Sequence, residues 1–577
     1  MTRLPSLLLL VAALTLPLDA LAMQIFIKTP ADTVLMNGKI YSGKVKNPWS
    51  QALAILDGQF SYVGDDVSAL IGSNTVVYDL NGRTVIPSLL DGHSHPGMVA
   101  LSSQYIELDD TSSKPRLMAS ITKMVEENPD VPVLIGGFWP NELFAVTGPH
   151  KSELDAIEPN RPMILFDAWA HTVWVNTKAL EMAGVTRETK DLVPGFSFYQ
   201  RDENGEATGW ITESAASLFI NLFQDVTPQV EQVLKDYLDY YQTLGVSSVL
   251  DAGNFGLDRE IYSAVARLDK QGLLPVTYHG VYTLFVPDDA PNAVAKLKAL
   301  ANEFNSDNIK IDTLKVFFDG ILETRTAAVS DDYLDTPGNK GEALLTREQL
   351  SNIILQLEAE GLNLHVHAVG DRATTTVLDA IEEARSRLGR PQTIRIAICH
   401  LETVKDTDFE RFKTLNVIAN FTPHWWIGGD NHWVAQGIGD EVNRMQRVQP
   451  LLVEGATVSF SSDITDAFEW KSHRADPYLG MQSGHTRQDV GSNEATPVFP
   501  PLSDRVTRQN MVNGYTSNAA YQLDRETEIG SIVVGKRADL VVLNQDLFTV
   551  DKYLMHKTKP VAVFTRGQIV FGALNEN

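Results

Sequence analysis

Short apolar segments alternate with longer amphipathic segments through the middle of the chain. The apolar segments have the length of single strands and occur at 86–92, 246–251, 276–283, 313–318, 362–368, 395–400, 417–421 and 457–462. Segments 347–361 and 373–389 repeat apolar residues at helical spacing. Strands that alternate with helices predict a parallel sheet with crossover helices. Eight such units fit an α/β fold, a (β/α)8 TIM-type barrel, which we expect over residues 87–521.

The two ends of the chain show a different pattern, with short alternating segments separated by turns. Between residues 33 and 82, Asn-Gly and Asp-Gly pairs separate the segments, which indicates hairpins. The last fifty residues repeat this pattern. We expect residues 23–86 and 522–577 to form one composite β-sandwich, because each end would cover sheet edges of the other. Two independent β appendages are the alternative.

The segment at about 105–240 is too long for a single connection between a strand and a helix of the barrel. It follows the first barrel strand. We therefore expect an inserted lobe at this point of the barrel.

The N-terminal residues 1–22 have the pattern of a signal peptide. Arg3 precedes the apolar run LLLLVAALTLPL, and Ala20-Leu21-Ala22 supplies small residues before Met23. The run is shorter than the ~20 residues that span a bilayer. The pattern predicts a cleaved signal, an exported periplasmic or secreted protein and no stable membrane anchor after cleavage, with an uncleaved anchor as the alternative.

The composition excludes some kinds of cross-link, metal site and partner. The only cysteine is Cys399, so an internal disulfide and a four-cysteine zinc site are excluded. Strand alternation predicts that Cys399 faces away from its neighbour His400, as a small buried hydrophobe. The net charge of −25 argues against nucleic acid or anionic lipid as a partner and favours a small-molecule substrate. The sequence does not define an oligomeric state.

Residues that can hold a metal follow the apolar segments. His93 and His95 lie one residue apart, so two imidazoles at a strand end point the same way; a solvated pair in a loop is the alternative. The other residues at strand ends are Lys315, His367, His400 and Asp463. Their positions predict one metal centre at the carboxyl ends of the strands. His365 precedes His367 by two residues, and the sequence leaves open which of the two faces the metal.

These segments together resemble a known family. The segments are PSLLDGHSHP, HTVWVNTKAL, RDENGEATGWITE, GVSSVLDAG, LKVFFDGILETRTAA, HVHAVGDRA, CHLE, FTPHW, SSD and GSIVVGKRADLVVL. They resemble the amidohydrolase superfamily, and within it amidohydrolase family 3, which includes enzymes similar to N-substituted formamide deformylase. The resemblance implies a metal-dependent hydrolase on a (β/α)8 barrel flanked by a composite β-sandwich.

The resemblance also implies roles for individual residues. His93, His95, His367 and His400 resemble metal ligands, Lys315 a lysine that CO2 can convert to a carbamate bridging two metals, and Asp463 the catalytic aspartate. One or two Zn2+ ions are the preferred cofactor, although Mn2+, Fe2+ and Co2+ accept the same ligands. Asp463 would take a proton from metal-activated water and return it to the leaving nitrogen.

Four further residues are candidates for substrate contacts: His171, Arg325, His424 and Trp425. Trp425 and its neighbour Trp426 either floor a pocket or pack a loop. The preferred hypothesis is hydrolysis of a non-peptide C–N bond in an amide or formamide of a small amine. The alternatives are a cyclic amidine hydrolase or deaminase, a lactone or ester hydrolase, and a non-catalytic binding or regulatory protein on the same scaffold.

Overall fold

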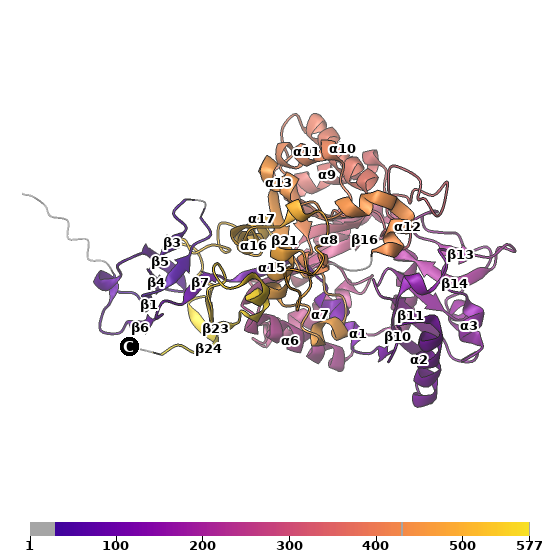
Figure 1. Cartoon of the computed structure of the whole chain (residues 1–577), viewed down its shortest axis with the longest axis horizontal. Helices are drawn as coiled ribbons and strands as arrows, with labels where there is room; N and C mark the ends of the chain where they lie inside the picture. Colours follow the sequence, from indigo (N-terminus) through magenta and orange to yellow (C-terminus); the bar gives the residue numbers. More distant parts are fainter. Residues whose placement is uncertain (1–28, 45, 428–430, 576–577) are drawn as a thin grey trace, which may run out of the picture.

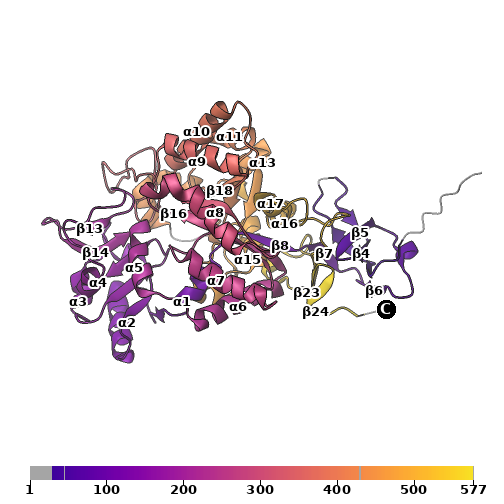
Figure 2. The same ribbon diagram turned by 180° about the vertical axis from the view of Figure 1, so that it is seen from behind.

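The computed structural model describes residues 29–44, 46–427 and 431–575. The predicted signal segment 1–22 lies outside these residues. Figures 1 and 2 show an elongated molecule with a β-rich domain at one end, a barrel in the middle and a second lobe at the other end. Among the described residues, no helix has the length and apolar character needed to cross a membrane.

Eight parallel strands form the central sheet. In order around the sheet they are β8 (Leu89–Ser94), β15 (Val246–Asp251), β16 (Thr277–Leu284), β17 (Ile309–Phe317), β18 (Asn363–Ala368), β19 (Ile396–His400), β20 (Ile418–Phe421) and β21 (Thr457–Phe460). The first and last strands meet just beyond their ends, where the Asp463 amide donates to the His93 carbonyl at 2.9 Å. The predicted TIM-type barrel is confirmed, with the eight expected strands in sequence order.

Helices pack outside the barrel strands, as the amphipathic segments predicted. Helix α9 (Arg347–Glu360) begins with a capping box between Thr346 and Gln349 and ends at Gly361, whose φ is +66°. Helix α10 (Asp371–Leu388) ends in the same way at Gly389. A residue without Cβ favours this left-handed conformation, and so both helices end where glycine follows.

The two ends of the chain share one β-rich domain. Strand β7 (Thr84–Pro87) pairs in parallel with β2 (Lys39–Tyr41) and antiparallel with β22 (Leu540–Leu543). One apolar core contains residues from both ends, among them Ile40 and Phe564. This pairing confirms the composite arrangement and rules out two independent appendages.

The inserted lobe contains a six-stranded sheet in which β9 (Ile106–Glu107) and β13 (Tyr199–Arg201) are the edge strands, and β14 (Ala207–Thr212) lies between β13 and β12 (Thr172–Val175). Its separate core holds Trp139, Trp174 and Trp210. Helix α6 (Pro228–Thr243), although inside the expected range 105–240, packs against β15 and α1 (Pro96–Ser102). Because α6 contacts barrel elements, it belongs to the barrel wall and the lobe ends before it.

Candidate metal centre

Three histidines from two strand ends surround one carboxylate. The Nε2 atoms of His93 and His95 each lie 3.4 Å from Asp463 Oδ1. His400, at the end of β19, places Nδ1 3.4 Å from Asp463 Oδ2. The structure thus brings four of the predicted residues into one cluster.

Backbone geometry fixes these side chains. Asp91 accepts hydrogen bonds from the amides of His93 and Ser462, and so it joins the first strand to the chain after the eighth. His400 has a φ of +75° and Asp463 a φ of +51°. Positive φ is uncommon outside glycine and is concentrated at functional sites. The left-handed backbone turns both side chains toward the centre of the barrel mouth.

The ionisation of the histidines fits a metal ligand set. Burial and the neighbouring Lys315 lower the pKa of His93 well below its usual value. Burial, His367 and Lys315 do the same to His400. Neutral His93 and His400 form no ion pair with the carboxylate at 3.4 Å, and His400 Nδ1 has no hydrogen-bond partner among the described residues. Uncharged nitrogen donors gathered around a carboxylate suit a divalent cation such as Zn2+.

Lys315 lies within the same cluster. Its side chain is buried, with Nζ 3.4 Å from His93 Nε2 and 3.5 Å from Cys399 Sγ. Neither neighbour carries a negative charge while the thiol is protonated, and burial raises the pKa of Cys399 to about 12. A buried ammonium without an anionic partner is costly. Conversion of Lys315 to a carbamate would remove this positive charge.

The two histidines of β18 take different positions. His367 lines a cavity beside the cluster, and its Nε2 lies 3.2 Å from the Gly320 carbonyl. Within the described part of the chain, its Nδ1 has no hydrogen-bond partner. His365 Nε2 lies 2.9 Å from His93 Nδ1 and therefore orients that ring from behind. Of the two, His367 is the one that faces the cavity. The contact between His365 and His93 Nδ1 fixes the tautomer of His93, because a partner on the distal nitrogen does so for a ligating histidine.

The orientation expected for Cys399 is wrong. Its Sγ lies close to the ring nitrogens of His93 and His400, and so it faces the cluster. Alternation along a strand predicts opposite faces for Cys399 and His400 only while the backbone stays extended. The positive φ of His400 breaks the alternation and lets both side chains point inward.

A cavity of about 460 Å³ opens beside the cluster. Its walls contain Lys315, His367 and Trp425, whose ring stacks on that of His400 at 5.5 Å and 11°. Trp426 instead is fully buried, and its ring packs against Phe421 of β20 and Phe460 of β21. Trp425 therefore lines the pocket, whereas Trp426 has a packing role.

The inserted lobe contributes His171 to the same cavity. His171 Nδ1 lies 2.6 Å from Glu213 Oε2, and Glu213 also accepts from Thr326 Oγ1 at 2.5 Å. Burial by itself lowers the pKa of His171, but the adjacent Glu213 carboxylate outweighs burial and raises it. The lobe thus places a histidine with cationic character at the cavity wall.

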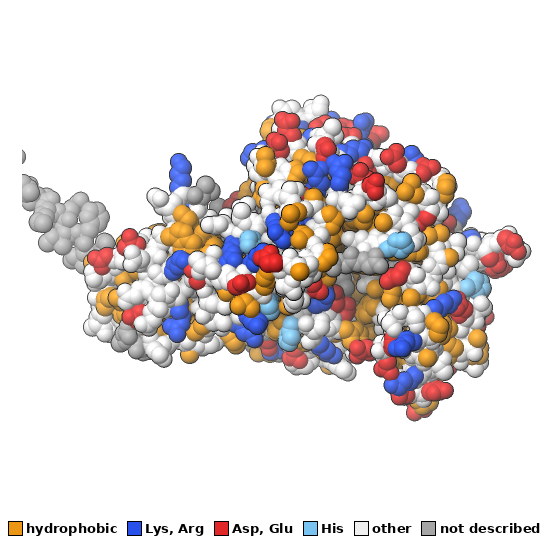
Figure 3. All heavy atoms as spheres, in the orientation of Figure 1, with side chains coloured by type: hydrophobic (Ala, Val, Ile, Leu, Met, Phe, Trp, Pro, Cys, Tyr) orange, Lys and Arg blue, Asp and Glu red, His pale blue; other side chains and the backbone are white. Residues whose placement is uncertain are grey.

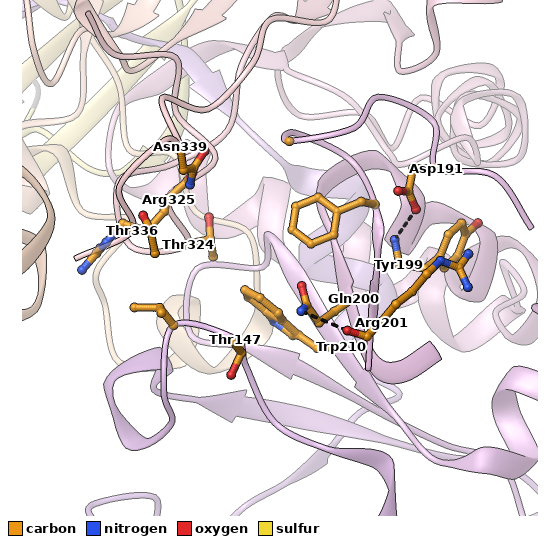
Figure 4. A pocket seen from close by; sticks show the side chains of 13 residues that line it. Thr147, Asp191, Tyr199, Gln200, Arg201, Trp210, Thr324, Arg325, Thr336 and Asn339 are labelled. Carbon is orange, nitrogen blue, oxygen red and sulfur yellow. Dashed lines mark hydrogen bonds between the residues drawn. The ribbon is translucent and has the colours of Figure 1, made fainter. Parts of the chain in front are cut away.

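Two predicted contacts lie elsewhere. His424 is buried, with Nε2 3.1 Å from the Asp476 carbonyl, and it is absent from the cavity wall. Arg325 binds Asp335 and three backbone carbonyls, and it borders a separate pocket with Trp210 and Asn339, drawn in Figure 4. Neither residue lines the metal cavity, and contact of His424 or Arg325 with substrate stays a prediction.

Glu323 and Glu402 were missed by the sequence analysis and line the cavity. Glu323 belongs to the loop after β17 and Glu402 follows β19 by two residues. Glu402 was visible only as part of CHLE, and Glu323 as part of ETRTAA. Glutamate after a strand end is common on surfaces, so no sequence signal separated these two from solvated residues.

Comparison of the sequence with known proteins shows which family and which proteins this chain is similar to. A sequence model of the amidohydrolase family matches residues 76–571. The exoenzymes regulatory protein AepA of Pectobacterium carotovorum is 28% identical over 426 residues, which are 72% of this chain and 90% of that protein. N-substituted formamide deformylase of Arthrobacter pascens is 24% identical over 532 residues, 89% of this chain and 94% of that enzyme.

A solved structure agrees with the fold. An uncharacterized metal-dependent hydrolase from Pyrococcus horikoshii OT3 aligns with a TM-score of 0.65 at 24% identity. The alignment covers 90% of this chain and 99% of that one. At this identity the structural similarity supports the fold described above. The reaction has to be inferred from the residues of the site.

Proposed function

Because the chain belongs to the amidohydrolase family, a family of metal-dependent hydrolases of C–N bonds, we propose that it hydrolyses an amide or formamide of a small amine. The observation that carries the proposal is the Asp463 carboxylate, which lies 3.4 Å from nitrogens of three histidines. The similarity to the formamide deformylase supports the choice of bond.

Different residues of this chain would bind the metal, transfer the proton and line the cavity. His93, His95, His367 and His400, with Lys315 as the residue open to carboxylation, would hold one or two divalent ions. When bound, such an ion lowers the pKa of a water ligand and polarises the substrate carbonyl. Asp463 is placed to accept the proton of the attacking water and to return it to the departing nitrogen. Trp425 and Phe317 line the cavity, and their apolar rings would limit water access to the reacting groups.

Metal analysis tests the first part of the proposal. Protein purified without chelator should contain about one to two divalent transition ions per chain, because neutral imidazoles and a carboxylate converge at one point. Zinc is the expected ion. Elemental analysis before and after dialysis against a chelator checks this, with activity followed on the same samples. Undiminished hydrolysis at a metal content near zero would contradict the proposal.

Other reactions and a non-catalytic function are alternatives to amide hydrolysis. The same site can attack other carbons that bear a leaving group, so deamination, cyclic amidine hydrolysis and lactone or ester hydrolysis are rivals. Ammonia release from a substrate panel would identify deamination, and a free amine with a new carboxylate would identify amide cleavage. The similarity to a regulatory protein favours a non-catalytic reading as second candidate. Absence of turnover by metal-loaded protein across the panel would support it.

Export is a separate part of the proposal. It is supported by Arg3, the apolar run and Ala20-Leu21-Ala22. N-terminal sequencing of the protein from its native host should begin at or near Met23, and the protein should be in the periplasmic or secreted fraction. Recovery of the intact residues 1–22 on cytoplasmic protein would overturn this part.

A further inference from the structure

Glu402 has an unsatisfied carboxylate in the cavity wall. Its side chain is 8% exposed, and its Oε2 has no hydrogen-bond partner among the residues that the structure describes. Glu323 lines the same cavity, and burial raises its pKa to about 7. Buried carboxylates are normally paired or bound to a cation, so Glu323 and Glu402 lack a counter-charge.

The basic groups nearby already have partners. His171 is bonded to Glu213 at 2.6 Å, and Arg325 to Asp335 at the same distance. Arg474 lies 3.9 Å from Glu469. Within the part of the chain that the structure describes, no basic side chain forms a salt bridge with Glu323 or Glu402. His171 and Arg325 act on Glu323 through electrostatics without a direct ion pair. A cation from outside the chain would supply the direct partner.

The aromatic residues around the cavity suit an organic cation. Trp169 and Trp425 meet edge to face with their centroids 6.2 Å apart, and Phe255 and Phe317 lie on the same wall. The faces of aromatic rings attract ammonium groups, and carboxylates beside them add a localised charge. A hydrated inorganic ion would gain nothing from such apolar surfaces.

We propose that Glu323 and Glu402 recognise a positively charged ammonium group on the substrate. The preferred substrates would then be N-acyl or N-formyl derivatives of amines that carry a second, cationic nitrogen. This inference rests on the proposed function for the scissile bond, but the cation site itself is independent of turnover. Charge-assisted hydrogen bonds to Glu323 and Glu402 would hold the ammonium while Asp463 serves the amide.

Binding is tested without catalysis. Isothermal titration of the metal-loaded enzyme with pentylammonium and with 1-pentanol compares a cation with a neutral molecule of the same chain length. The cation should bind at least about tenfold more tightly, because an ionic hydrogen bond contributes that much or more. Equal affinities, or no binding of either molecule, would overturn the proposal whatever the enzyme hydrolyses.

Turnover gives a second readout. N-(4-aminobutyl)formamide carries a cation at neutral pH, whereas N-pentylformamide has the same chain length and no charge. The ratio of their kcat/KM values should favour the cation by about tenfold. Hydrolysis of both without preference would refute the cation site and leave the proposed function standing. If neither compound is hydrolysed but pentylammonium binds tightly, the cation site would stand and the proposed function would be refuted.

Three variants locate the effect. Glu323→Gln and Glu402→Gln should each lower both the pentylammonium affinity and the kcat/KM ratio by about tenfold, since Gln keeps the size of Glu but cannot carry the negative charge that pairs with an ammonium. Glu441→Gln removes the same charge from an exposed position outside the cavity and should change neither value. Loss of bound metal in the Glu323 or Glu402 variant would assign that residue to the metal centre and contradict the proposal.

Discussion

Replacement of Asp463 by Asn is expected to lower kcat by at least about a hundredfold while most of the metal is retained. Asn has the size of Asp but cannot accept the proton of the attacking water. The three histidines around Asp463 remain in place, and so metal content should fall little. Measurement of kcat and metal content on one sample provides the comparison.

The choice of Asn also controls for the backbone. Asp463 has a φ of +51°, and its amide donates to the His93 carbonyl. Asn tolerates the left-handed conformation about as well as Asp, whereas Ala would add strain. A thermal melting temperature close to that of the wild type would show that the fold is intact. Near-normal kcat in metal-loaded Asp463→Asn protein would remove the residue from the mechanism.

The second large effect is expected for Lys315→Ala. We expect a loss of metal affinity or activity of about 10- to 100-fold, the size seen when a residue that supports metal ligands is removed. The reason is the position of Nζ, 3.4 Å from His93 Nε2 inside a buried cluster. Titration of metal into chelator-treated wild type and variant measures the affinity, and kcat/KM of the loaded forms measures the activity.

A rescue experiment separates the two roles of Lys315. If the lysine acts as a carbamate, a short carboxylate such as acetate or propionate in the cavity left by Ala should restore part of the metal binding. Lys315→Met, which fills the space without a charge, should not respond to these acids. Full metal binding and activity in the unrescued Ala variant would exclude Lys315 from the centre.

The strands and most of the cluster followed from the sequence because their signals are local. Apolar runs of strand length marked all eight barrel strands, and the C-terminal ends of parallel strands meet at one face. His93, His95, His400 and Asp463 therefore had to lie near one another once the barrel existed. The composite β-domain was also readable, because each end alone had uncovered edges.

Errors arose where loops or unusual backbone angles decide the direction of a side chain. Cys399 was assigned by alternation, which the positive φ of His400 interrupts. Arg325, in the loop after β17, and His424, in the short 3-10 helix Pro423–Trp425, lie outside the metal cavity, and their contacts depend on distant partners such as Asp335 and the Asp476 carbonyl. No local pattern encodes such partners, and only the folded chain reveals them.

The pairing of β7 with β22 has a consequence for the order of folding during synthesis. The N-terminal strands are made first, yet β7 lacks its antiparallel neighbour until residues 540–543 have left the ribosome. Contacts across more than four hundred residues are slow to form because loop closure costs entropy. The early strands must therefore keep an unpaired edge exposed for most of translation. A chaperone that covers strand edges would act on this chain mainly before its last forty residues appear.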